Sequence, residues 1–352
     1  MALCVLAMSS AAAGEIGGSA LYEARVAVDD RSADARRGGI REAGIIVLAR
    51  ITGERDPQEH PELSAIVDEL QSLVSRYSIE TDDDDGLALR VRFDADAMDR
   101  EVRATGHALW GRERPRTLVW LAMRDGGDRR LVRGDDGSGV LAELTETAHR
   151  RGLPLLFPLM DLEDRAKVDF ADIWGGFDDQ VLEASARYNA NAILIGRLER
   201  SGSNAWSGRW TLYQPDGAVR WRGSPEPRRQ ALAEGLHETA DRMALRFAVD
   251  GGPDGGDGLK LRVRGLNELE DYVAVERYLQ SLTPVEQLRL ESLERDTAIF
   301  LIQSRGGLRT LEQAIELGDR LVRAESGEQS AELRGTLVEM SPVEALPTYR
   351  LR

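Results

Sequence analysis

Residues 192–198 read Ala-Ile-Leu-Ile-Gly-Arg-Leu, the strongest signal of regular structure in the chain. A short apolar run of this kind is typical of a central strand that is buried on both faces of a sheet. A helical pattern at 181–188 leads into it through Asn189-Ala190-Asn191. Helix and buried strand in alternation predict a layered α/β domain.

The flanking sequence extends this domain on both sides. A second apolar run, Thr117–Met123, predicts another buried strand, and 140–151 and 228–248 have helical patterns. Residues 153–160 are strand-like but contain two prolines, which favours an edge strand or the end of a strand. The turn Gln214-Pro215-Asp216-Gly217 joins two short strands and predicts a hairpin. We therefore expect a central α/β domain over residues 115–250.

An N-terminal α/β unit is predicted over residues 20–110. Its expected order is strand, two helices, two strands and a helix, and the apolar run Ile45–Leu48 is expected after the first helix. The strands are expected at 21–28, 77–80 and 87–93, and helices at 61–74 and 94–105.

A third domain follows a glycine-rich linker at 251–258, where no side chain can build a core. Residues 259–340 show the order β-α-β-β-α-β, which predicts a ferredoxin-like domain with its last strand at 333–340. Residues 341–352 are expected to be a loose tail. The fold class is thus mixed α+β and α/β, with two N-terminal α/β units, a linker and a ferredoxin-like domain.

The first 13 residues predict export. An apolar run at 2–8 precedes Ala11-Ala12-Ala13, the pattern of a signal peptide that is cleaved near Ala13. No Lys or Arg precedes the run, so the first helix of a cytosolic domain is the alternative. Cys4 is the only cysteine, and cleavage would leave a periplasmic protein without thiols.

Charge excludes two classes of partner. The chain has 352 residues and a net charge of −15, which argues against nucleic acid and against anionic membrane surfaces. No long uncharged apolar segment follows the signal peptide, so we expect no membrane span. Of the 46 basic residues only Lys167 and Lys260 are lysines, which we attribute to codon usage and not to function.

No catalytic or metal-binding motif is present, and no cofactor site is predicted. His60, His107, His149 and His237 lie in or beside predicted helices, so we assign them no catalytic role. The run Asp82–Asp85 lacks the ligand spacing of a calcium loop and is interpreted as a solvated turn. A second group of acids could serve a carboxylate-based hydrolase or form a charged surface: Asp161, Glu163, Asp164, Asp169, Asp172, Asp178 and Asp179.

Four tryptophans are the candidate binding residues. Trp206, Trp210 and Trp221 lie on the predicted hairpin, and Trp174 precedes two glycines. Trp206 and Trp210 have the same strand parity and so share one face. Because tryptophan is enriched at interaction hot spots, that face is a possible protein-binding surface, and burial in the core is the alternative.

Six segments between about residues 21 and 249 form a recognisable set: LYEARVAVDDRS, GIIVLARITG, TLVWLAM, GLPLLFPLMDLED, DIWGGFDDQVLEASARYNANAILIGRLER and WSGRWTLY. With these segments the chain resembles the exported proteobacterial family called domain of unknown function 2066. More loosely, the helix, strand and hairpin are similar to the amino-terminal domain of TolB and to activators of penicillin-binding proteins. The family resemblance implies an exported protein and supplies no activity, whereas the looser similarity implies binding to other proteins.

These observations predict a non-enzymatic periplasmic protein that binds or scaffolds envelope proteins. The alternative is an enzyme acting on an envelope polymer, with the acids of 161–179 in its site. A purely structural assembly module built on the C-terminal domain is a third possibility.

Overall fold

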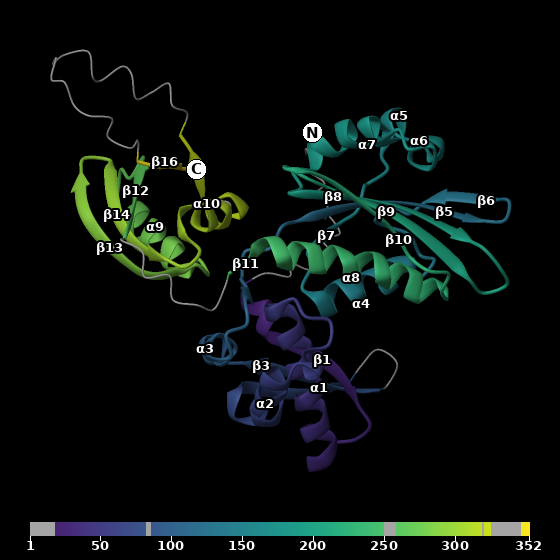
Figure 1. Ribbon diagram of the computed structural model, residues 1–352, viewed down its shortest axis with the longest axis horizontal. Coiled ribbons are helices and arrows are strands. Elements are labelled where there is room, and N and C mark those ends of the chain that lie inside the picture. The colour runs from purple at the N-terminus through teal and green to yellow at the C-terminus, as the bar shows by residue number, and fades with distance from the viewer. Residues whose placement is uncertain (1–17, 82–85, 250–257, 319, 325–345) are drawn as a thin grey trace, which may run out of the picture. The chain divides into compact units, whose positions relative to one another are not determined.

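The computed structural model describes residues 18–81, 86–249, 258–318, 320–324 and 346–352. Within them the fold is mixed α/β, with ten α-helices and several sheets (Figure 1). The chain divides into two compact units: unit 1 holds 1–98 and 114–246, and unit 2 holds 99–113 and 247–352. The predicted signal peptide, the aspartate run and most of the predicted linker lie outside the described residues.

One layer of unit 1 is a three-stranded antiparallel sheet in the order β1-β3-β2. The apolar run Ile45–Leu48, expected after the first helix, lies inside α1, because nothing stops that helix before Gly53 (φ 80°). At the other end, the Ser32 hydroxyl accepts a hydrogen bond from the Ala35 N–H at 3.1 Å. The elements are β1 (Glu23–Val28), α1 (Ala33–Thr52), α2 (Pro61–Glu69), β2 (Val74–Thr81) and β3 (Leu87–Phe93).

The second sheet of unit 1 has the strand order β10-β9-β8-β5-β6. The two predicted buried strands are β5 and β8, and they are parallel neighbours at its centre. The predicted edge strand at 153–160 is reduced to β7, which pairs with β5 between Pro154 and Pro158. The strands are β5 (Thr117–Asp125), β6 (Asp128–Leu131), β7 (Leu155–Leu156), β8 (Ala192–Arg200), β9 (Trp206–Gln214) and β10 (Gly217–Arg222).

Helices cover both faces of this sheet. Figure 1 shows α5, α6 and α7 on one side and α4 and α8 on the other. On the first side, Trp120 and Ile195 of the sheet share a core with Ile173 of α6 and Val181 of α7. The helices are α4 (Val140–Arg151), α5 (Leu162–Lys167), α6 (Phe170–Gly175), α7 (Asp178–Ser185) and α8 (Arg228–Phe247).

Buried arginines join the two layers of unit 1. Nε of Arg50 in α1 donates to the His149 carbonyl at 2.6 Å. Arg151 of α4 is 2% exposed, and its Nη2 donates to the Gly53 carbonyl at 2.5 Å and to Asp241 at 2.7 Å. Because hydrogen bonds and ion pairs offset the cost of burying a guanidinium, these contacts hold α1, α4 and α8 together.

Unit 2 contains a five-stranded sheet in the order β13-β14-β12-β16-β15. The expected last strand at 333–340 lies outside the described residues. Part of the expected loose tail instead forms β16, parallel to β12, because the fully buried Tyr349 anchors it in the core. The strands are β12 (Leu259–Arg264), β13 (Val285–Glu294), β14 (Thr297–Ser304), β15 (Leu321–Arg323) and β16 (Thr348–Leu351), and the helices are α9 (Leu269–Ser281) and α10 (Gly307–Leu317).

The remaining elements are short or isolated. A two-stranded antiparallel pair joins β4 (Leu109–Trp110) to β11 (Ala248–Val249), and α3 covers Ala95–Ala104. No helix within the described residues has both the length and the apolar character needed to cross a bilayer.

Candidate functional site

The hairpin tryptophans do not form an exposed surface. Trp206 and Trp210 are 8% and 1% exposed, so their interpretation as a binding surface is wrong. They do share a face, but that face of β9 packs against α8. The Trp210 ring fits there because Gly235 of α8 and Gly196 of β8 lack side chains: a Cβ at either would lie within 2.4 Å of the ring.

The other two tryptophans lie on opposite faces of the sheet. Trp221 of β10 pairs directly with Trp210 and therefore points to the α8 side, where Arg242 lies 5.4 Å from its ring centre. Trp174 belongs to α6, on the other side, and its ring stacks on Phe170 with centroids 5.2 Å apart. The four predicted site residues therefore do not come together.

The acids of 161–179 have local structural roles instead of converging on a cleft. Asp161 caps α5 and pairs with Arg187 at 2.9 Å, and this hydrogen bond lowers the Asp161 pKa to about 2. Asp164 is fully buried and accepts a hydrogen bond from the Met160 N–H at 2.8 Å. Tyr188 also donates its hydroxyl hydrogen to Asp164.

The remaining acids of this group act at helix ends or in ion pairs. Asp169 and Asp172 form a capping box at the start of α6, and Asp178 pairs with Arg197 at 2.7 Å. Among the described residues, no three His, Cys, Asp or Glu side chains are grouped so that they could hold a metal ion. The hydrolase hypothesis therefore has no support from these carboxylates.

The histidine with the largest pKa shift lies at the junction of α1, α4 and α8. Burial and the nearby Arg151 lower the pKa of His237 to about 4, and the His237 Nδ1 lies 3.3 Å from Nη1 of Arg151. Burial also lowers the pKa of His149. Both rings are neutral near pH 7, and the arginines beside them favour a structural role over proton transfer.

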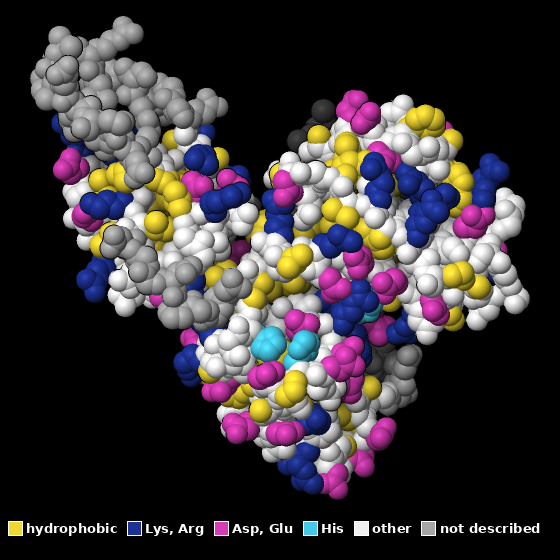
Figure 2. Space-filling model, viewed as in Figure 1, with side chains coloured by type: hydrophobic (Ala, Val, Ile, Leu, Met, Phe, Trp, Pro, Cys, Tyr) yellow, Lys and Arg dark blue, Asp and Glu magenta, His cyan; other side chains and the backbone are white. Residues whose placement is uncertain are grey.

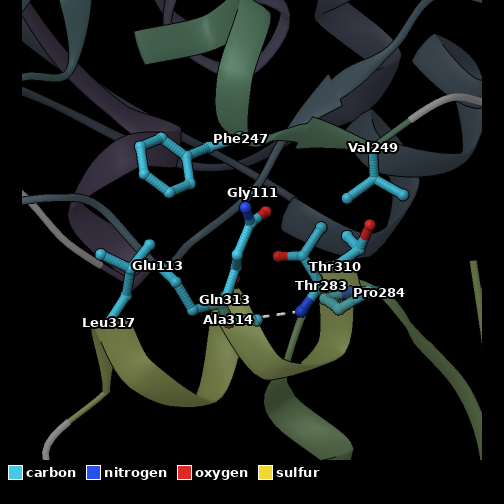
Figure 3. A pocket seen from close by; sticks show the side chains of 10 residues that line it. All are labelled: Gly111, Glu113, Phe247, Val249, Thr283, Pro284, Thr310, Gln313, Ala314 and Leu317. Atoms are coloured by element: carbon cyan, nitrogen blue, oxygen red, sulfur yellow. Dashed lines mark hydrogen bonds between the residues drawn. The ribbon is translucent and has the colours of Figure 1, made fainter. Parts of the chain in front are cut away.

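Unit 2 contains a small cavity beside α10 (Figure 3). Its volume is about 20 Å³, room for about one water molecule. The Glu113 carboxylate lines it and accepts a hydrogen bond from the Thr283 N–H at 3.2 Å, while burial raises the Glu113 pKa. A space of this size cannot hold an organic substrate, so we do not assign it a binding function.

A stronger candidate is a cross-strand row of arginines on the α6 side of the central sheet. Arg197 of β8 lies between Ala122 of β5 and Arg209 of β9, and Arg209 lies opposite Arg222 of β10. Directly paired residues point to the same face of a sheet. The three arginines therefore share the face that carries α6.

Further arginines enlarge this row into a surface. Arg124 of β5 lies opposite Arg129 of β6, and Arg220 is two residues from Arg222. Figure 2 shows Lys and Arg side chains gathered over this sheet. We call the surface the arginine face and define it by six arginines: Arg124, Arg129, Arg197, Arg209, Arg220 and Arg222. Among the described residues, Asp178 and Glu199 are the carboxylates that form ion pairs with them.

Three of these arginines have no ionic partner among the described residues. Arg124 pairs with Glu199, and Asp178 pairs with Arg197 and lies 3.8 Å from Arg220. Nothing in the described parts of the chain places a carboxylate within ion-pair range of the other three: Arg129, Arg209 and Arg222. A local excess of positive charge thus persists on a chain whose net charge is −15.

Aromatic contacts orient the centre of the arginine face. The guanidinium carbons of Arg124 and Arg209 lie 4.5 and 5.6 Å from the ring centre of Trp174. Stacking on an aromatic ring restrains a guanidinium and leaves its in-plane N–H donors available. Tyr213 donates to Asp178 at 2.7 Å, and burial and this bond raise its pKa, so the phenol stays neutral.

The position of the arginine face in the sheet also favours the binding of a ligand. Arg124 and Arg197 lie toward the carboxyl ends of the parallel strands β5 and β8, where ligands commonly bind in α/β sheets. Sequence reasoning missed this surface because its arginines span residues 124–222 and meet only through strand register. The available signal was the alternation of Arg209, Arg220 and Arg222 with the hairpin tryptophans.

Residues 18–111 match the model of a family described as a domain of unknown function, DUF8605. No curated protein matches the chain.

The resemblance to domain of unknown function 2066 over about 21–249 is wrong, because the matched family is a different one and its match ends at residue 111. The looser similarity to TolB and to activators of penicillin-binding proteins likewise has no named relative behind it. Over residues 18–111 the chain is similar to DUF8605, which has no described function.

Proposed function

We propose that this chain is a non-catalytic binding protein whose arginine face recognises an acidic segment of another protein. The observation that carries the proposal is the set of three arginines without a carboxylate partner among the described residues, Arg129, Arg209 and Arg222. Exposed cations on a strongly acidic chain attract a ligand that brings its own carboxylates. Arginine suits this ligand because its planar fork binds carboxylates with two hydrogen bonds.

An acidic protein segment fits this surface better than a nucleic acid does. Single-stranded nucleic acids need open aromatic rings on which bases stack. The ring of Trp174 already contacts Phe170, Arg124 and Arg209. The net charge of −15 would in addition repel a long polyphosphate chain, whereas a short acidic segment contacts only the arginine face.

A binding titration tests the proposal. The probe is a fluorescently labelled twelve-residue glutamate-rich peptide, measured by anisotropy at low and high salt. We expect Arg209→Ala combined with Arg222→Ala to weaken binding about a hundredfold, roughly tenfold for each exposed charge contact. Arg289→Ala is the matched control, because Arg289 is also an exposed strand arginine without a carboxylate partner among the described residues. Equal losses in both variants, or tighter binding of single-stranded DNA of equal charge, would refute the proposal.

Two finer assignments stay proposals. The order β12, α9, β13, β14, α10 supports a ferredoxin-like plan for the C-terminal domain, with β16 as a strand parallel to β12 beyond that plan. The apolar N-terminal run followed by Ala11-Ala12-Ala13 supports export to the periplasm and an envelope protein as the partner. Detection of the chain in a periplasmic fraction, shortened near Ala13, would test the second assignment.

A further inference from the structure

The arginine face ends at an edge strand. In the described residues β10 is the last strand of its sheet and pairs only with β9. From Ala218 onward its residues are exposed at every second position, Arg220 and Arg222 included. An edge strand exposes unpaired backbone donors and acceptors that can hydrogen-bond to another extended chain.

The hydrogen-bond pattern shows which backbone groups face that edge. The Gly223 N–H donates to the Gly208 carbonyl at 3.0 Å. In an antiparallel pair, hydrogen-bonded and non-hydrogen-bonded positions alternate. Trp221 and Val219 therefore bond to β9, and the backbone groups of Arg220 and Arg222 point to the free edge.

Arg220 and Arg222 can thus offer a partner both backbone hydrogen bonds and side-chain ion pairs. Their backbone groups face the edge, while their side chains lie on the arginine face. We infer that the acidic partner binds as an extended strand added to β10, with Asp or Glu at alternate positions on the arginine face. This inference rests on the proposed function and specifies the conformation and the sequence pattern of the partner.

The geometry of a sheet explains the alternate spacing. Side chains of a strand point to one face at every second residue, and directly opposite Cβ atoms lie about 4.5–5.5 Å apart. A carboxylate opposite Arg220 or Arg222 is then within reach of its guanidinium. Arg209 lies one strand further in, about 4.8 Å away, and can reach the same carboxylates with its long side chain.

Three peptides of equal length and charge test the inference. The first alternates Glu and Thr, the second has its glutamates in one block, and the third is the first with N-methyl groups on alternate amides. We expect the alternating peptide to bind the full chain at least about tenfold more tightly than the other two, because both lose paired contacts. On binding, hydrogen exchange at the amides of Arg220 and Arg222 should slow.

The outcomes separate the inference from the function on which it rests. If all three peptides bind equally and exchange at β10 is unchanged, while Arg209→Ala with Arg222→Ala still weakens binding, strand addition is wrong and acidic recognition stands. If none of the peptides binds, both are wrong. The comparison among the three peptides uses the unaltered protein, so misfolding of a variant cannot produce a difference between them.

Discussion

A methyl group at Gly235 should destabilise unit 1, although alanine is the better helix former. In Gly235→Ala the new Cβ would lie 2.3 Å from Cε2 of Trp210. Carbon atoms pack at about 3.5–4.0 Å, so the ring or the helix must move by more than about 1 Å. The ring cannot retreat toward the sheet, because a Cβ at Gly196 would already be 2.4 Å from it.

The expected loss follows from two opposing effects. Overpacking a core costs about 1–3 kcal/mol, and we take the upper end because Trp210 is rigid and enclosed. Replacing glycine by alanine in a helix returns about 1 kcal/mol. Gly235→Ala should therefore lower the free energy of unfolding by about 2 kcal/mol. The matched control is Gly38→Ala in α1, where the new methyl group has no atom within 4 Å and should stabilise by about 1 kcal/mol.

Urea unfolding followed by tryptophan fluorescence and by circular dichroism measures both variants. An unchanged slope with a shifted midpoint identifies a change in stability and not in the denatured state. If Gly235→Ala is stabilised as much as Gly38→Ala, the ring does not occupy the space beside α8, and the assignment of Trp210 to the core is wrong.

Two other perturbations test the interior of unit 1. Because the pKa of His237 falls to about 4 in the fold from an ordinary 6.5, folding favours its neutral form. Stability should be full above pH 6.5 and fall by ~2 kcal/mol, after allowance for solvent screening, as the pH drops from 6.5 to 4. Urea midpoints at pH 7 and pH 5 should show a smaller difference in His237→Gln, and an equal difference would exclude His237 as the cause. Asp164→Ala should cost about 3 kcal/mol because it leaves the Tyr188 hydroxyl and a buried N–H without their acceptor. Asp179→Ala, at an exposed position in the same group of acids, should change the unfolding free energy by less than about 0.5 kcal/mol, and similar effects of the two would contradict the buried role of Asp164.

Local pattern was sufficient to predict the centre of unit 1. The runs Thr117–Met123 and Ala192–Leu198 are mostly apolar and short, as in a strand covered on both faces of a sheet, and they are β5 and β8. The boundaries of α1 and the position of Tyr349 in the sheet of unit 2 are harder to predict from the sequence. Whether an apolar stretch continues a helix, or a chain end joins a sheet, depends on partners that are distant in sequence.

The candidate site shows the same division between local and distant information. Strand parity correctly placed Trp206 and Trp210 on one face, but parity cannot say which face meets the core. That choice depends on Gly235, in a helix that begins after the hairpin, and on Gly196 in the preceding strand. A single sequence provides no signal that links these glycines to the tryptophan ring.

The buried tryptophans of β9 and the arginine face lie on opposite sides of the sheet. In β9 the buried residues Trp206 and Trp210 alternate with Arg209, which is exposed. The side of β9 that packs against α8 stabilises the fold, whereas exposed charged side chains on the other side contribute little to stability. Arg209→Ala with Arg222→Ala should therefore weaken binding without lowering the free energy of unfolding. Weaker acidic-peptide binding at unchanged stability would then be a property of the surface alone. A double variant with both weaker binding and a lower free energy of unfolding would show that the two sides of the sheet are not independent.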